Sequence, residues 1–155
     1  MSEHVVLVDS IGQWKKGFPD YPVVAVRDYL VDPVWSNRRN LRVLNLCRDT
    51  DYHSPGYYAS LLAEARGHKV IPSVRTLQDL SRKAMYSTEL VDLDRQVEKL
   101  FRDHPVETTR FEMLVCFGRC EAHELRHLAR ALFETFRAPL IKVELKRARA
   151  WRNTA

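Results

Sequence analysis

The segment from residue 41 to residue 71 constrains the fold of this chain more than any other part of the sequence. Residues 41–47 (LRVLNLC) form a mostly apolar run, which predicts a strand buried on both faces. Residues 56–66 have apolar side chains at helical spacing, and Gly67 is placed to cap that helix. Residues 69–71 predict a second strand. A strand, a helix and a strand within about 30 residues predict a βαβ unit with parallel strands.

An apolar stripe predicts which face of this helix is buried. Four residues recur at positions i, i+3, i+4 and i+7, the spacing that places side chains on one side of a helix. They are Tyr58, Leu61, Leu62 and Ala65. We therefore expect these side chains to pack against the sheet.

The rest of the chain adds strands and helices around this unit. Further strands are predicted at 4–8, 22–26, 108–117 and 139–146. Further helices are predicted at 76–86, 88–102 and 121–136, the first capped by Thr76 and the last buried through Leu125, Leu128, Ala129, Leu132 and Phe136. The polar segment 32–40 is expected to break regular structure.

This order of elements predicts an α/β fold. We expect a single domain over 1–146, with a mixed, mostly parallel sheet that contains the βαβ unit and has helices on its faces. Residues 147–155 are expected to form a basic tail, and we expect the chain to be a fragment of a longer protein or a truncated gene product.

Composition and charge exclude several classes of protein. Apolar residues make up 45% of the 155 residues, too many for a disordered chain. No apolar run approaches the ~18–20 residues of a membrane span, and three cysteines make no disulfide framework, so we expect a cytoplasmic protein without a membrane partner. The net charge is +5, but residues 142–155 carry +4 of it. Because the remaining 20 basic and 19 acidic residues nearly cancel, nucleic acid is disfavoured as a partner.

The loop between the first strand and the helix of the βαβ unit is the best candidate for a binding site. Ligands of open α/β sheets bind beyond the carboxyl ends of strands, and the N–H groups at a helix start can hold an anion. We assign ligand binding to Arg48, Tyr52, His53, Ser54, Gly56 and Tyr57. The alternative interpretation is purely structural: Arg48 would pair with Asp49 or Asp51, while Tyr52 and His53 would only cover the helix end.

The cysteines and histidines do not predict a metal site. The spacing Cys116-x3-Cys120-x2-His123-x3-His127 resembles one. However, both histidines lie opposite the apolar stripe of their helix, so the four ligands would not converge. Cys47, which ends the buried strand, is expected to be an inert apolar thiol rather than a reactive one.

No complete catalytic motif is present in the sequence. It has no GxGxxG, GxxxxGK[ST], GxSxG or HExxH pattern. We therefore assign no catalytic residue to this chain.

Several segments nonetheless resemble one family, the N-terminal domain of RimK-like ATP-grasp ligases. The resemblance covers nearly the whole chain, and its most specific part is NLCR at 45–48 followed by HSPGYYASLLAEARGH at 53–68. The other matching stretches are RDYL at 27–30, IPS at 71–73, TLQDL at 76–80 and APLIKVE at 138–144.

The resemblance implies an accessory role in a ligase. RimK-like enzymes join a carboxylate to an amine, often adding glutamate, through an acyl phosphate made from ATP and Mg²⁺. That chemistry belongs to a separate ATP-grasp module, so the resemblance implies ATP and Mg²⁺ only with that module, in cis or in trans, and no cofactor in this chain. Alone, the chain would not be an enzyme, and it would bind substrate or dock to the module.

Two other functions stay open. One is a stand-alone module that binds an anionic small molecule or nucleic acid. The other, supported only by the loop, is a small enzyme with His53 as a base.

Overall fold

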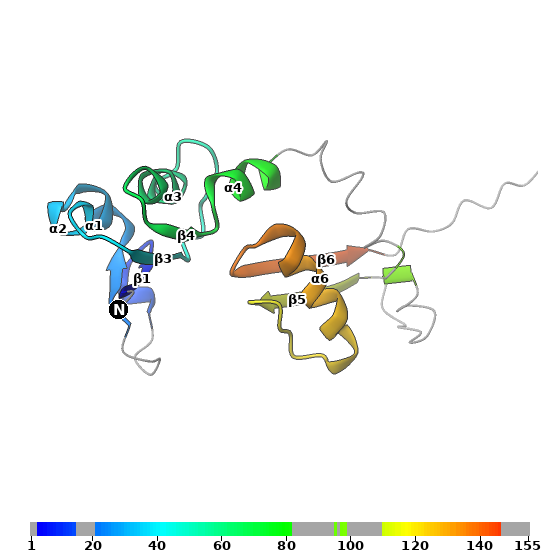
Figure 1. Cartoon of the computed structure of the whole chain (residues 1–155). Coiled ribbons are helices and arrows are strands. Elements are labelled where there is room, and N and C mark those ends of the chain that lie inside the picture. Colours follow the sequence, from blue (N-terminus) through cyan, green and yellow to red (C-terminus); the bar gives the residue numbers. More distant parts are fainter. Residues whose placement is uncertain (1–2, 15–20, 82–94, 96, 99–109, 147–155) are drawn as a thin grey trace, which may run out of the picture.

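The computed structural model describes residues 3–14, 21–81, 95, 97, 98 and 110–146, and these form two separate sheets (Figure 1). The first has four parallel strands in the order β2-β1-β3-β4. They are β1 (Glu3–Val8), β2 (Val23–Ala25), β3 (Leu41–Asn45) and β4 (Lys69–Ile71). The second pairs β5 (Arg110–Cys116) with β6 (Leu140–Lys146) in antiparallel fashion. The α/β class and the mostly parallel sheet are therefore confirmed, and the antiparallel strands form a sheet of their own.

The βαβ unit is confirmed as β3, α3 (Pro55–Ala65) and β4. Gly67 follows α3 with a φ of 75°, a left-handed conformation that suits glycine at a helix end. The second crossover helix, α1 (Val26–Val31), connects β2 to β3. Because α1 and α3 contact each other in one core with β1 and β3, both cover the same face of the parallel sheet.

Two short helices differ from the sequence-based prediction: one was not expected, and the other begins at a different capping residue. Residues 32–40 were expected to be irregular, but a short helix α2 (Pro33–Ser36) lies there. Asp32 Oδ1 accepts a 2.8 Å hydrogen bond from the Val34 N–H, and Pro33 occupies the first turn, where its missing N–H costs nothing. In α4 (Val74–Ser81), Ser73 is the capping residue, since its Oγ accepts from the Thr76 N–H at 3.1 Å. The prediction of Thr76 as the cap is wrong.

The buried face of α3 is not the predicted one. Tyr58 and Leu61 are 38% and 39% exposed, and Ala65 is exposed as well. The residues that face the sheet are smaller and include two that are fully buried, Ala59 and Ala63. Small side chains let the helix axis approach the strands closely, so the face toward the sheet buries small residues. Tyr57 is buried elsewhere, in a cluster with Val74 and Leu77. Position in the fold, rather than apolar periodicity, decides which face is covered.

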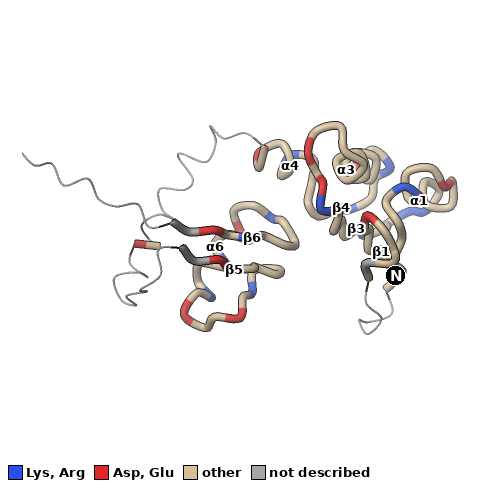
Figure 2. The backbone as a smooth tube through the Cα atoms, turned by 180° about the vertical axis from the view of Figure 1, so that it is seen from behind, with Lys and Arg blue, Asp and Glu red and all other residues tan. Residues whose placement is uncertain are grey.

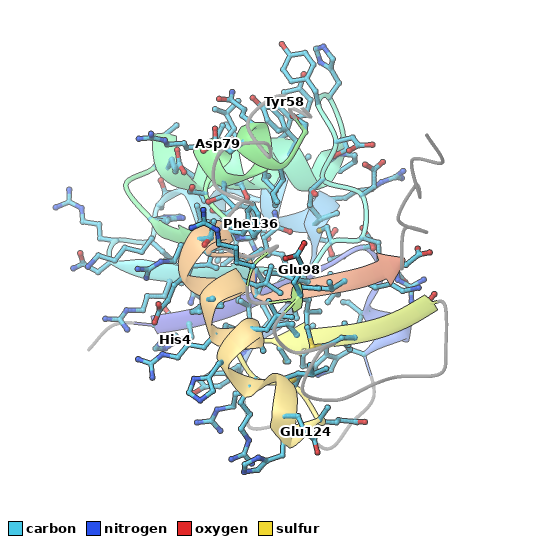
Figure 3. All side chains as sticks on the ribbon, turned by 90° about the vertical axis from the view of Figure 1, so that its right-hand side faces the viewer. His4, Tyr58, Asp79, Glu98, Glu124 and Phe136 are labelled. Atoms are coloured by element: carbon cyan, nitrogen blue, oxygen red, sulfur yellow. The ribbon has the colours of Figure 1, made fainter. Side chains whose placement is uncertain are left out.

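One face of the antiparallel sheet packs against a helix, and Val97 also contacts the core between them. After the turn η2 (His123–Leu125), α6 (Arg126–Phe136) packs over β5 and β6 (Figure 3). Its predicted buried stripe is confirmed: Leu125, Leu128, Ala129 and Leu132 are buried, and Phe136 is half-buried. The opposite face of the sheet is exposed at Leu114, which is 61% accessible.

The predicted helix at 88–102 lies mostly outside the described residues, and so does the tail at 147–155. Among the helices described, none has both the length and the apolar content that a membrane span requires. Within the described residues, β5 and β6 confirm the predicted strands at 108–117 and 139–146. Residues 108 and 109 of the first strand, and residues 82–86 of the predicted helix at 76–86, lie outside the described residues.

Candidate functional site

The candidate site lies where β1 and β3 end, side by side in the parallel sheet. After β1 the chain passes to β2, which lies on the side of β1 away from β3. After β3 the chain passes to β4, which lies on the side of β3 away from β1. The two loops therefore leave the sheet in opposite directions, which is the arrangement at which open α/β sheets bind ligands. The Arg48 N–H donates to Asp9 Oδ2 at 3.1 Å and joins the two loops. This junction places Asp9 next to the sequence-predicted loop.

Backbone and side-chain hydrogen bonds shape the loop after β3. Ser54 Oγ donates to the Asp49 carbonyl oxygen at 3.1 Å and accepts from the Tyr57 N–H at 3.1 Å, so Ser54 is the predicted N-cap of α3. Asp49 Oδ1 accepts from the Asp51 N–H at 3.1 Å, and the Ser54 N–H donates to the Asp51 carbonyl oxygen at 2.9 Å. Ser54 is buried. Its observed contacts are those of a residue that holds the loop.

Gly56 is required by the close approach of the loop to α3. A Cβ at this position would lie 2.3 Å from the Asp49 carbonyl oxygen and 2.9 Å from the Cys47 Cβ. Neither backbone nor strand can move away easily. Gly56 is buried, so its observed role is to allow packing.

Aromatic rings gather at the start of α3. The Tyr52 ring lies 3.9 Å from that of His53 and 5.2 Å from that of Tyr57, between ring centroids. His53 has a φ of 72°, a conformation uncommon outside glycine, and a hydrogen bond of 2.8 Å joins its Nδ1 to the Tyr58 hydroxyl. Tyr57 is buried, whereas Tyr52 is 67% exposed. The structure thus brings Tyr52, His53 and Tyr57 together and adds Tyr58, which the sequence reasoning had placed in the core.

Arg48 is exposed, and among the described residues its guanidinium makes no ion pair with Asp49 or Asp51. The helix start offers less to an anion than expected. The Tyr57 N–H already bonds Ser54 Oγ, and the Tyr58 N–H bonds the Ser54 carbonyl oxygen at 3.1 Å. Any attraction for an anion at this loop therefore comes mainly from the Arg48 side chain.

A buried amide, which the sequence reasoning missed, anchors the loop from below. Asn45 is 2% exposed, and its Nδ2 donates to the Gly56 carbonyl oxygen at 2.7 Å and to Ser60 Oγ at 3.0 Å. Its Oδ1 accepts from the Cys47 N–H at 3.2 Å. A polar residue at the end of an apolar strand is the signal that could have identified this anchor.

Cys47 is buried beneath the loop, as expected of an inert thiol. Burial raises its pKa to about 12, and the nearby Asp9 carboxylate adds to the rise because a thiolate there would be repelled. Arg48 does not activate this cysteine.

The other cysteines and histidines do not converge. Cys116 is exposed near the end of β5, whereas the Cys120 thiol donates to the Ala122 carbonyl oxygen at 3.2 Å. Within the described part of the chain, no three histidine, cysteine or acidic residues are placed to hold a metal ion.

Comparison with known proteins shows the family of this chain. No curated protein matches the sequence. The RimK-like ATP-grasp N-terminal domain family matches residues 26–155, a range that begins at α1 and contains the whole βαβ unit and the candidate loop. Strands β1 and β2 precede this range, although β1 supplies Asp9 at the junction. The chain belongs to the family of RimK-like ATP-grasp N-terminal domains.

Proposed function

We propose that this chain is an accessory, non-catalytic domain of a RimK-like ATP-grasp carboxylate–amine ligase, and that its loop after β3 binds an anionic group of the ligand. The family match over residues 26–155 is the observation that carries the ligase context. In this proposal the ATP-grasp module, in cis or in trans, binds ATP and Mg²⁺ and performs the reaction.

Arg48 is the residue expected to hold the anion. A guanidinium forms paired hydrogen bonds with a carboxylate or a phosphate, and that of Arg48 is exposed where β1 and β3 end. Its backbone is fixed to Asp9 and its loop to Ser54, so little ordering is needed upon binding.

The aromatic rings provide the second part of the proposed surface. The exposed rings of Tyr52 and His53 are in contact, with their planes tilted by 58°. Tyr57 is held by a 3.2 Å hydrogen bond from Gln78 Nε2 to its hydroxyl. Figure 3 shows Tyr58 at the top of the view and Glu124 at the bottom. Exposed rings of this kind suit contact with an apolar or planar group, or with the surface of the catalytic module.

The experiment uses the chain together with the ATP-grasp module encoded after or beside it. We expect Arg48→Ala to raise the KM for the carboxylate substrate at least tenfold with little change in kcat, because it removes a binding contact. The control is Arg130→Ala, which removes an exposed arginine of α6 that pairs with Glu134 at 2.9 Å. Unchanged KM in Arg48→Ala, or full ligase activity without this domain, would refute the proposal.

The alternative function is a stand-alone module that binds an anionic ligand or nucleic acid, and the exposed Arg48 would serve it equally well. Basic and acidic positions are interspersed along the described chain (Figure 2), so no basic stripe favours nucleic acid. Titration with single-stranded DNA at about 50 and 200 mM salt separates these functions. Binding that weakens steeply with salt would support the alternative, and absence of binding would remove nucleic acid as the ligand.

A further inference from the structure

The side of α3 that points away from the sheet is apolar and uncovered. Five residues form it, which we call the outer α3 face, and they include the whole apolar stripe that the sequence predicted to be buried. They are Pro55, Tyr58, Leu61, Leu62 and Ala65, of which Leu62 is half-buried and the others are exposed. At ~100° per residue they fall within about one third of the helix circumference, opposite the small residues that face the sheet.

The outer α3 face carries no charge. Glu64 is the only charged residue between Pro55 and Ala65, and its Oε1 accepts from the Val74 N–H of α4 at 2.9 Å. Surface helices usually have charged side chains on the side away from the core. A contiguous exposed apolar surface marks an interaction site, whereas a single exposed leucine does not.

Neighbouring helices lie on both sides of this face without covering it. Figure 1 shows α3 between α1 and α4, and both contact it. On the α4 side, Tyr57 packs with Val74 and Leu77. On the α1 side, Arg66 donates to the Tyr29 carbonyl oxygen at 3.0 Å. The flanks of α3 are therefore occupied, and its outer face is the part that remains for a partner.

The outer α3 face continues into the candidate ligand loop. Tyr58 belongs to both, because its side chain is 38% exposed and its hydroxyl lies 2.8 Å from His53 Nδ1. The exposed Tyr52 ring lies 3.9 Å from the His53 ring and extends the aromatic surface beyond the start of the helix. A partner bound to α3 would therefore also contact the loop that we assign to ligand binding.

This continuity favours one occupant. Under the proposed function, the ligand held by the loop must reach the ATP-grasp module, so that module has to lie beside the loop. The family match identifies this chain as the N-terminal domain that accompanies such a module. A second copy of this chain would cover the same surface but would bring no site at which the ligand reacts.

We propose that the outer α3 face docks the ATP-grasp module of the ligase and holds it next to the ligand loop. The inference rests on the proposed function and adds the surface through which the two parts meet. The matching surface of the module is expected to be apolar, because a charge placed against Leu61 would lose its water without gaining a partner.

The test is iodoacetamide labelling of Ala65→Cys in the isolated chain and in the presence of the ATP-grasp module, joined to the chain or supplied separately. Ala65 is exposed, so the introduced thiol should be labelled fast in the isolated chain. Docking should slow labelling at least fivefold, as measured by mass spectrometry. Thr135→Cys, at an exposed position of α6, is the matched control and should be labelled at the same rate in both samples.

A second substitution tests whether apolar contact causes the protection. Leu61→Arg, added to Ala65→Cys, should restore fast labelling in the presence of the module, because it places a charge in the contact. Thr135→Arg should not restore it. Since Leu61 is 39% exposed, Leu61→Arg should leave the midpoint of urea unfolding of the isolated chain unchanged, which shows that the variant folds.

Two outcomes would overturn the docking surface. One is equal labelling of Ala65→Cys with and without the module. The other is slow labelling in the isolated chain that becomes slower as the chain concentration rises, since a second copy would then be the occupant. The KM of Arg48→Ala judges the ligand site separately: an unchanged KM together with protection of Ala65→Cys would refute the ligand site and support the docking surface.

Discussion

The helices α3 and α6 have the same length of 11 residues, but they are buried through opposite kinds of side chain. Helix α3 faces the parallel sheet with small residues such as Ala59 and Ala63, and it exposes Leu61. Helix α6 faces the antiparallel sheet with large residues such as Leu128 and Leu132. One helix is therefore stabilised by a close approach of backbones, and the other by interdigitated apolar side chains.

Polar contacts follow the same division. Beneath α3, the buried Asn45 donates to the Gly56 carbonyl oxygen and to Ser60, and Ser60 Oγ donates to the Pro72 carbonyl oxygen at 2.8 Å. The core of α6 consists of apolar residues and Cys120. A close backbone approach brings peptide groups together and needs hydrogen-bond partners for them, whereas a core of large aliphatic side chains keeps peptide groups apart.

Thiol reactivity should give the largest difference between the two regions. Because burial raises the pKa of Cys47 from 9.0 to about 12, its thiolate fraction at pH 8 is about a thousandfold lower in the folded protein than in the unfolded chain. We expect iodoacetamide labelling of Cys47 to be slower by at least this factor, as measured by mass spectrometry. The exposed Cys116 should react at similar rates in the folded and unfolded chain.

The same pKa predicts a loss of stability at alkaline pH. The folded state keeps the Cys47 thiol protonated, so its contribution is complete below pH 9 and is lost progressively as the pH rises toward 12. Burial also raises the pKa of Tyr29, which acts in the same direction above pH 10. Urea unfolding at pH 8 and 10.5 should show a smaller loss in Cys47→Ala than in the unmodified chain. An equal loss would contradict this assignment.

Truncation of one leucine in each helix should give the next largest difference in stability between the two regions. Leu128→Ala removes a side chain that is 5% exposed beneath α6, and we expect it to lower the free energy of unfolding by about 2–5 kcal/mol. Leu61→Ala is the matched change on α3, where the leucine is 39% exposed, and should cost less than about 1 kcal/mol. Chemical denaturation measures both. Similar losses would mean that Leu61 is covered in solution.

Addition of one methyl group should destabilise the region of α3, where the helix lies close to the loop. Gly56→Ala would place a Cβ 2.3 Å from the Asp49 carbonyl oxygen, so we expect it to destabilise the protein by about 1–3 kcal/mol. Gly12→Ala is the control, because its nearest atom would be Ser10 Oγ at 3.8 Å. If both substitutions have the same effect on urea unfolding, the close approach at Gly56 does not exist.

Removal of the α3 cap should give the smallest effect. Ser54→Ala deletes the hydroxyl that accepts from the Tyr57 N–H and should cost about 1 kcal/mol. Helix α6 begins at Arg126, and Leu125 before it makes no side-chain capping bond, so that region has no equivalent position. Ser81→Ala, which removes a 2.8 Å bond to the Gln78 carbonyl oxygen at the exposed end of α4, should cost less. Thermal unfolding that ranks these variants in reverse would contradict the capping assignment.

The candidate site was predicted in part. The loop after β3 could be located because a polar, aromatic segment followed an apolar strand, and Ser54 could be recognised as a cap from the proline after it. Asp9 could not be assigned to the site, since only the strand order places the end of β1 beside that of β3. Tyr58 was assigned to the core because its spacing matched the apolar stripe, but it points to the loop and bonds His53.

By itself, the sequence determined local structure and family membership. The alternation of apolar residues, the caps and the glycines specify the strands, α3, α6 and the βαβ unit, because these signals act over a few neighbouring residues. The tertiary structure alone decided which face of α3 is buried and which loops lie together at the ends of β1 and β3. Those properties depend on contacts that no local sequence pattern shows. Gly56 must fit under Asp49, and Arg48 must meet Asp9, which is 39 residues away in the chain.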